Sequence, residues 1–334
     1  MCTVNWTELK IFTSSQGVEA VTGRLMDIGI SGFVIQDKND FEDFLLHKDG
    51  NWDYIDDDLY ELRTAETSVT VYIPDDAEGL EMLSMIKTEL SSLKAADENK
   101  ELGRLVCEFS SIREEDWANN WKKYFKPLKI GSKLLIKPSW EIAEPDEERT
   151  VVEIDPAASF GTGQHNTTQL CLELLEKNIA SGDRLLDLGC GSGILSVSAV
   201  KLGAAYAAAV DIENDAAAAA KENARKNGIA ENRYTSMCGD ITSDSRLREN
   251  IGTGYDVVCA NIVADVLIAM SQYFGGFVRE NGMLIVSGII EKRLSEVIDA
   301  IAKHGFTLIE KRQKDDWIAC SFIKRTTSGQ QKER

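Results

Sequence analysis

A glycine-rich turn is the first feature of this sequence that could do chemistry. Residues 187–193 read Asp-Leu-Gly-Cys-Gly-Ser-Gly and lie between an apolar run and a helix predicted over 194–202. Glycines at a strand-to-helix turn let a ligand touch the backbone, which is typical of nucleotide-type sites. The spacing is GxGxG, because Ile194 stands where a dinucleotide fingerprint needs its third glycine. Gly189 and Gly191 are therefore candidate binding residues for a ligand other than NAD.

A carboxylate follows the next apolar run. Asp211 lies 22 positions after Gly189 (211 − 189 = 22), where a carboxylate can accept both hydroxyls of a ribose. Capping of the helix that follows is better assigned to Asn214 or Asp215. Asp211 is therefore predicted to contact the ligand.

Two further polar side chains follow later apolar runs. Asp240 comes after the third predicted strand, where it either lies near an adenine or forms a turn. Asn261 ends the fourth run, and an amide at the carboxyl edge of a sheet can orient an amine without carrying charge. The alternative for Asn261 is a simple strand-end turn residue.

A second glycine-rich segment precedes these runs. Residues 154–168 contain Gly161 and Gly163, which argue against a helix, yet they lead into an apolar helix predicted over 170–175. Thr167 and Thr168 are placed at the N-terminus of that helix.

The elements that must position these residues form a repeated pattern. Apolar runs separated by helical stretches predict a parallel sheet with helices on both faces. Residues 306–310 and 317–323 lie close together in the sequence, as a terminal antiparallel pair would. The four apolar runs are residues 185–188, 207–211, 257–260 and 283–286.

Residues 1–110 follow another order. Strand, helix, strand, strand, helix and strand are predicted in turn, which is typical of an α+β ferredoxin-like domain. The acidic segment 37–61 carries five aromatic residues and is either a docking surface or an excursion that packs back on the domain. The six elements are predicted from residues 4–11, 18–28, 32–35, 69–73, 80–93 and 105–109.

The remaining segments complete the expected domain organisation. Residues 111–147 are expected to form a helical linker and a first strand, with Trp117, Trp121 and Phe125 on one helix face until Pro127. Residues 148–325 are expected to form the second domain and 326–334 a polar tail.

The composition excludes several classes of protein. With 37 Lys and Arg against 55 Asp and Glu in 334 residues, the net charge of −18 does not suit direct binding to nucleic acid, and a macromolecular partner is expected to be basic. No apolar run reaches the roughly 18 residues of a membrane span, and the start lacks a signal peptide, so a cytoplasmic protein is expected. Seven scattered cysteines and three histidines predict core thiols and neither disulfides nor a metal site.

The segment at 154–168 resembles a known family, the PrmA-type methyltransferases of large-subunit ribosomal protein eleven. Their signature loop reads Asp-Pro-Gly and then Phe-Gly-Thr-Gly-x-His-x-Thr-Thr, and residues 155–168 follow it in order. Ala157 and Asn166 depart from it, since the family usually has Gly and Pro there. The resemblance also includes residues 116–117, 121–122, 136–141, 189–193 and 260–262, and Trp317.

The resemblance implies S-adenosylmethionine as cofactor, with contacts at Thr168, Gly189, Asp211 and Asn261. It also implies that Phe160 and His165 belong to a loop that closes over the cofactor. The full cofactor set expected from the residues and the resemblance together is Phe160, Thr168, Gly189, Gly191, Asp211, Asp240 and Asn261.

We therefore expect a class I methyltransferase domain, a Rossmann-like doubly wound sheet with an antiparallel terminal strand, behind an N-terminal substrate-recognition domain. The resemblance implies that the chain methylates lysine and N-terminal amines of ribosomal protein eleven, and we expect it to be a monomer. Asn261 is the predicted catalytic residue, because its carbonyl could aim the lone pair of the amine while the proton is lost to water.

Three alternatives stay open. The first is a glutamine, nucleic-acid or small-molecule amine methyltransferase; those that act on amide or base nitrogens often show Asn/Asp-Pro-Pro-Tyr/Phe, where residues 261–264 here read Asn-Ile-Val-Ala, which counts against them. A nicotinamide oxidoreductase is disfavoured by Ile194, and a non-catalytic ribosome-binding module does not need the cofactor residues that this chain retains.

Overall fold

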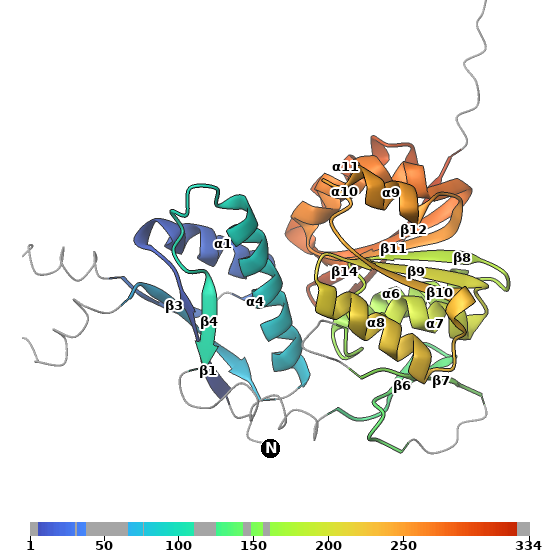
Figure 1. The fold of residues 1–334 in the computed structure, drawn as a ribbon, viewed down its shortest axis with the longest axis horizontal. Coiled ribbons are helices and arrows are strands. Elements are labelled where there is room, and N and C mark those ends of the chain that lie inside the picture. The colour runs from blue at the N-terminus through green and yellow to red at the C-terminus, as the bar shows by residue number, and fades with distance from the viewer. Residues whose placement is uncertain are drawn as a thin grey trace, which may run out of the picture. The chain divides into compact units, whose positions relative to one another are not determined.

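The computed structural model divides the chain into two compact units, Met1–Tyr124 and Phe125–Arg334 (Figure 1). It describes residues 6–30, 32–37, 66–75, 77–109, 125–142, 148–155 and 161–325. Most of the acidic segment, the connector with its two tryptophans, Phe160 and the tail lie outside the described residues. Within the described ranges, no helix has both the length and the apolar character needed to cross a membrane.

The first unit confirms the predicted ferredoxin-like order. Its antiparallel sheet has the strand order β2-β3-β1-β4. Each helix joins two strands that have a third strand between them in the sheet. The elements are β1 (Trp6–Phe12), η1 (Ser15–Gly17), α1 (Val18–Asp27), β2 (Phe33–Gln36), β3 (Ser68–Pro74), α4 (Ala77–Ala96) and β4 (Val106–Phe109).

Alternation along the strands separates the two faces of this sheet. Leu9 and Val71, which are paired in the register, are fully buried on the face that α1 and α4 cover. On the opposite face Trp6, Tyr72 and Val34 are 60%, 48% and 55% exposed. The first unit therefore has one apolar core and one open face that carries aromatic side chains.

The second unit contains the predicted doubly wound sheet, with strand order β10-β9-β8-β11-β12-β14-β13. Neighbours from β10 to β12 are parallel, and β14 is antiparallel to both β12 and β13. Its strands are β8 (Arg184–Leu188), β9 (Tyr206–Asp211), β10 (Tyr234–Cys238), β11 (Tyr255–Asn261), β12 (Val278–Ile290), β13 (Phe306–Lys314) and β14 (Trp317–Lys324).

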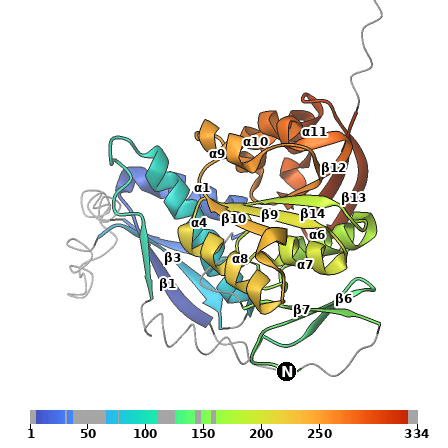
Figure 2. The same ribbon diagram turned by 45° about the vertical axis from the view of Figure 1, so that its right-hand side comes forward.

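Helices cover both faces of this sheet (Figures 1 and 2). Successive residues such as Leu185 and Leu186 point into two different cores, one shared with α6, α7 and α8 and the other with α9, α10 and α11. This explains why the central strands are apolar throughout. The helices are α6 (Asn166–Asn178), α7 (Ile194–Leu202), α8 (Asn214–Lys226), α9 (Ser245–Ile251), α10 (Ala264–Phe277) and α11 (Leu294–Ala302), with 3-10 turns η4 (Glu231–Arg233) and η5 (Glu291–Arg293).

A small sheet completes the second unit, and only one strand of it, within residues 111–147, was predicted from the sequence. Its order is β5-β6-β7, from strands β5 (Leu128–Ile130), β6 (Leu134–Lys137) and β7 (Thr150–Glu153). Ile136 and Ile154 contribute to the core beneath α6 and α7. Phe125, expected on a helix, instead precedes β5 without helical structure and packs near Trp140.

Six of the seven cysteines are described, and none of these six forms a disulfide. Cys171, Cys190, Cys259 and Cys320 are buried thiols as predicted. Cys238 is exposed and Cys107 is half-buried, so the expectation that all are core residues was wrong for these two. Both belong to strands at the edge of their sheets.

Candidate active site

The candidate residues converge because parallel strands end at the same edge of the sheet. Gly189 follows β8, while Asp211 and Asn261 are the last residues of β9 and β11. Asp240 comes two positions after the end of β10. Since these four strands are neighbours, one edge of the second unit carries all four residues.

The glycine turn needs glycine for two separate reasons. Gly189, Gly191 and Gly193 have φ values of +71°, +51° and +77°, in the left-handed region that other residues avoid. A Cβ at Gly193 would lie 2.8 Å from both the Cβ of Ala220 and the hydroxyl of Tyr234. The turn is therefore shaped by its backbone and by close packing of α8.

Asp211 is bonded to the glycine turn itself. Its Oδ2 accepts from the Gly191 N–H at 2.9 Å, and its Oδ1 accepts from the Glu213 N–H at 3.0 Å. Burial raises the pKa of Asp211, and these N–H donors oppose the rise. Each carboxylate oxygen has a further lone pair, so both can still accept a hydroxyl.

The predicted caps of α8 were wrong. The helix begins at Asn214, its N-cap residue is Glu213, and no side chain caps it. Because β9 ends at Asp211 and α8 already begins at Asn214, both predicted caps lie within the helix instead of before its first turn. Asp211 instead accepts the N–H of the N-cap residue.

Asn261 and Thr168 are brought together across 93 positions of sequence. The Asn261 amide Nδ2 donates to the Thr168 hydroxyl at 3.3 Å. Thr168 is fully buried in the first turn of α6, as predicted from the sequence. The helix N-terminus thus contacts the end of β11 through these two side chains.

His165 holds the start of α6. Its Nδ1 accepts from the Thr167 N–H at 3.3 Å and lies 2.7 Å from the Thr167 hydroxyl. Its ring meets Trp317 edge-on, with 4.8 Å between centroids. Burial lowers the pKa of His165 to about 4, so the imidazole is neutral at pH 7.

The departure at Asn166 has a local explanation. Its amide Nδ2 donates to the Asp315 carboxylate at 2.7 Å. Asn166 therefore joins the first turn of α6 to the β13–β14 hairpin.

Ile262 is wedged between two glycines. A Cβ at Gly189 would lie 2.4 Å from Ile262 Cγ2, and a Cβ at Gly288 would lie 2.4 Å from the Ile262 carbonyl oxygen. Both glycines have positive φ. This packing sets where β11 ends and hence where Asn261 lies.

Asp240 forms a turn in this structure. Its Oδ1 accepts from the Thr242 N–H at 2.7 Å, and its Oδ2 accepts from the Ser243 hydroxyl at 2.9 Å. Burial raises the pKa of Asp240, but the bonds from Thr242 and Ser243 outweigh it, so the net shift is downward. Contact with a ligand stays a prediction for this residue, as it does for Phe160, which lies outside the described residues.

Asp187 is a buried acidic residue next to the glycine turn that was not predicted from the sequence as a site residue. It is fully buried in β8, and its Oδ2 accepts from the Ser196 N–H at 3.1 Å. Its Oδ1 has no hydrogen-bond partner among the described residues. Burial raises its pKa to about 7, with the charge of Asp211 adding to the rise. An acid inside an apolar run was the signal available in the sequence.

Comparisons with known proteins agree over nearly the whole chain. Residues 5–325 match the family model described as ribosomal protein L11 methyltransferase (PrmA). The chain is 35% identical to the ribosomal protein L11 methyltransferases of Acetivibrio thermocellus, over 95% of this chain and 97% of that protein, and of Caldanaerobacter subterraneus subsp. tengcongensis, over 96% and 100%. A solved ribosomal protein L11 methylase from Lactobacillus delbrueckii subsp. bulgaricus aligns with a TM-score of 0.53 and 29% identity, covering 61% of this chain and all of that one. With the predicted resemblance and fold thus confirmed, this chain belongs to the ribosomal protein L11 methyltransferase (PrmA) family.

Proposed function

We propose that this chain transfers methyl groups from S-adenosylmethionine to lysine and N-terminal amines of ribosomal protein L11. The observation that carries the proposal is the Asn261–Thr168 contact at the sheet edge that also holds the glycine turn and Asp211. This arrangement supplies both a nucleoside site and an amide beside it. The proposed substrate is inferred from the names of the family and of the relatives.

The residues present fit the methyl donor. S-adenosylmethionine supplies a methyl group on a positively charged sulfur, together with ribose hydroxyls and an ammonium group that donate hydrogen bonds. Asp211 offers a carboxylate to the hydroxyls, and Asp187 Oδ1 is a buried carboxylate oxygen that has no partner in the described chain. The donor groups of the ligand and the acceptors of the site are therefore complementary.

Thr168, Gly189 and Gly191 complete the proposed cofactor contacts. The two glycines leave the backbone open to close approach. The Thr168 hydroxyl stands in the first turn of α6, and the N-terminus of a helix favours a carboxylate.

Asn261 is proposed to orient the attacking amine. A lysine ammonium has no lone pair, and deprotonating it at pH ~7 costs roughly 4 to 5 kcal/mol. Because Asn261 Nδ2 is bonded to Thr168, its carbonyl oxygen remains to accept an N–H of the neutral amine. That bond aligns the lone pair with the methyl group.

The proton is proposed to leave to water. His165 is held by Thr167 and has its pKa lowered to about 4, which makes it a weak base at neutral pH. Burial of a substrate amine in the site lowers its pKa and reduces the cost of losing the proton.

The first unit is proposed to recognise the protein substrate. All candidate cofactor and catalytic residues lie in the second unit, while the first presents Trp6, Tyr72 and Val34 on an open sheet face. Aromatic residues are enriched in protein interfaces. We further propose that the enzyme acts in the cytoplasm as a monomer.

The test is methyl transfer itself. The full chain is incubated with S-adenosylmethionine labelled on its methyl group and with extracted ribosomal proteins, and the labelled residues are found by mass spectrometry. Label on lysine or N-terminal amines of ribosomal protein L11 is expected. Label on RNA alone, or on amide nitrogens, would refute the proposed substrate.

A further inference from the structure

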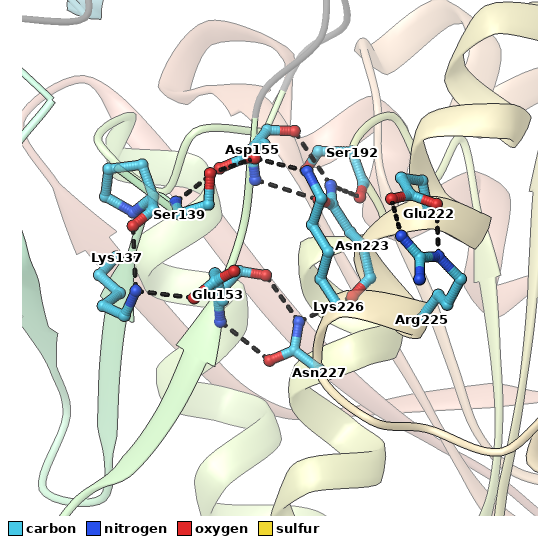
Figure 3. A network of polar contacts seen from close by, with 11 residues as sticks. Lys137, Ser139, Glu153, Asp155, Ser192, Glu222, Asn223, Arg225, Lys226 and Asn227 are labelled. Atoms are coloured by element: carbon cyan, nitrogen blue, oxygen red, sulfur yellow. Dashed lines mark hydrogen bonds and ion pairs between the residues drawn. The ribbon is translucent and has the colours of Figure 1, made fainter. Parts of the chain in front are cut away.

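Asn223 on α8 and Asn227, the C-cap residue of the same helix, bond to the backbone at the end of the small sheet. Asn227 accepts from the Glu153 N–H at 2.9 Å and donates to the Glu153 carbonyl at 2.6 Å. Asn223 repeats the pattern with Asp155, accepting from its N–H at 3.0 Å and donating to its carbonyl at 3.1 Å (Figure 3). The backbone N–H and carbonyl groups of residues 153 and 155 point away from β6, because the N–H of the residue between them, Ile154, bonds to the carbonyl of Lys137 in β6. The two amides therefore stand where another strand would pair.

The two asparagines differ in a single contact. Each amide nitrogen has a second hydrogen. In Asn227 it goes to the carbonyl of Asn223 at 2.8 Å, within the helix. In Asn223, which is 1% exposed, it goes to the carbonyl of Ser192 at 2.9 Å, inside the glycine turn (Figure 3).

The Ser192 residue is fixed from two directions. Its hydroxyl donates to the Gly161 carbonyl at 2.6 Å, and its carbonyl accepts from Asn223. Next to it, the Gly191 N–H is committed to Asp211. Ala220, one turn before Asn223 on the same helix, packs against the position of Gly193. Helix α8 therefore holds both the carbonyl and the close packing of the glycine turn.

The end of β7 does not depend on Asn223 alone. The Asp155 carboxylate accepts from the Ser139 N–H at 2.6 Å and from Lys226 Nζ at 2.5 Å. These bonds outweigh the burial of Asp155 and lower its pKa. Loss of the Asn223 amide therefore leaves the strand anchored while it releases the Ser192 carbonyl.

We propose that Asn223 is a positioning residue that fixes the Ser192 peptide and thereby sets the affinity of the glycine turn for S-adenosylmethionine. This inference rests on the cofactor site proposed above. A turn whose peptides are already oriented loses less freedom when a ligand binds, so removing the brace should weaken binding.

Asn227→Ala is the matched control, because it removes an equivalent pair of backbone bonds, to Glu153 instead of Asp155, from the C-cap of the same helix without touching the glycine turn. Affinity for S-adenosylmethionine and S-adenosylhomocysteine is measured by calorimetry, and Tm is measured without ligand. Both variants should lower Tm by similar amounts. Only Asn223→Ala should weaken binding, by about tenfold or more, while Asn227→Ala stays within about twofold of the wild type.

Three results separate the possibilities. Equal loss of affinity in both variants would show that the asparagines act through β7, and unchanged affinity in both would show that Asn223 has no positioning role; either overturns the inference. A wild-type chain that binds neither ligand would refute the proposed cofactor site instead. If Asn223→Ala does not fold, Asn223→Asp, which keeps an acceptor for the Asp155 N–H, takes its place in the same comparison.

Discussion

Replacing Asp187 by Asn should make the stability of this protein less sensitive to pH. The carboxyl has a pKa of about 7 in the folded chain against an ordinary value of 3.8. Each unit of difference corresponds to about 1.4 kcal/mol, so the ionised side chain destabilises the folded state by roughly 4 kcal/mol above pH 7. The folded state holds the proton more tightly than the unfolded state, and wild-type stability therefore falls as pH rises from about 4 to about 7.

An Asn side chain removes this ionisation but introduces a cost of its own. Its amide can accept from the Ser196 N–H as Oδ2 does now, but its N–H group then occupies the place of the unpartnered oxygen. An unsatisfied buried donor costs about 1 to 3 kcal/mol at any pH. The informative quantity is therefore the change of the effect with pH, which cancels this constant term.

The assay is urea unfolding of both proteins, without cofactor, at pH 5 and pH 8. The stability of Asp187→Asn relative to wild type should rise by roughly 2 to 3 kcal/mol between these two values. Asp256→Asn is the control whose effect should not change over this range, because the Arg184 N–H and the Arg279 guanidinium outweigh burial and lower the pKa of Asp256, so that this carboxyl is ionised in the folded and unfolded states from pH 5 upward. Parallel behaviour of Asp187→Asn and wild type across this range would refute the raised pKa.

Three further predictions concern ligand, chemistry and substrate. Asp211→Asn, which keeps one acceptor for the backbone but loses the charge, should weaken S-adenosylmethionine binding roughly ten- to hundredfold in calorimetry, and an unchanged Kd would mean that the carboxylate serves only the turn. Asn261→Ala should raise the activation free energy of methyl transfer by about 1 to 3 kcal/mol, and so lower kcat, with little change in cofactor Kd. The kcat defect of Asn261→Asp should shrink from pH ~7 to pH ~9, because its carboxylate favours the protonated amine. A loss confined to cofactor affinity would refute the orienting role. Trp6→Ala should raise KM for ribosomal protein L11 and leave cofactor Kd unchanged. Ile309 is an exposed apolar residue of the second unit, and Ile309→Ala should change neither quantity. Equal KM values for both variants would argue against recognition of the substrate by this sheet face.

The sequence was sufficient wherever a functional residue adjoins the element that presents it. Asp211 and Asn261 each end an apolar run, and parallel strands in one sheet end at one edge, so their convergence followed from local pattern and topology. The helix at 194–202 was predicted with the bounds it has, because an apolar periodic stretch began at the turn and ended at Gly203.

The contacts that fix the glycine turn from other elements could not be predicted in this way. Asn223 and Ser192 are separated by 31 positions and meet only because α8 packs on the turn. The strands around Ile136 and Val152 are short, and no periodicity distinguishes a strand of three or four residues from a loop. Asp187 was passed over because its effect depends on burial, which an apolar run suggests but does not measure.

The cost of Asp187 has a counterpart in the chemistry of the site. Burial raises the pKa values of both Asp187 and Asp211, and the charge of Asp211 adds to the shift of Asp187. Ionisation of both carboxyl groups is therefore disfavoured. A ligand that carries positive charge at this edge would favour the ionised form of each, and we expect it to bond to Asp187 Oδ1, which has no hydrogen-bond partner among the described residues. We therefore expect the arrangement that makes the free protein less stable at neutral pH to favour a positively charged ligand over an uncharged nucleoside.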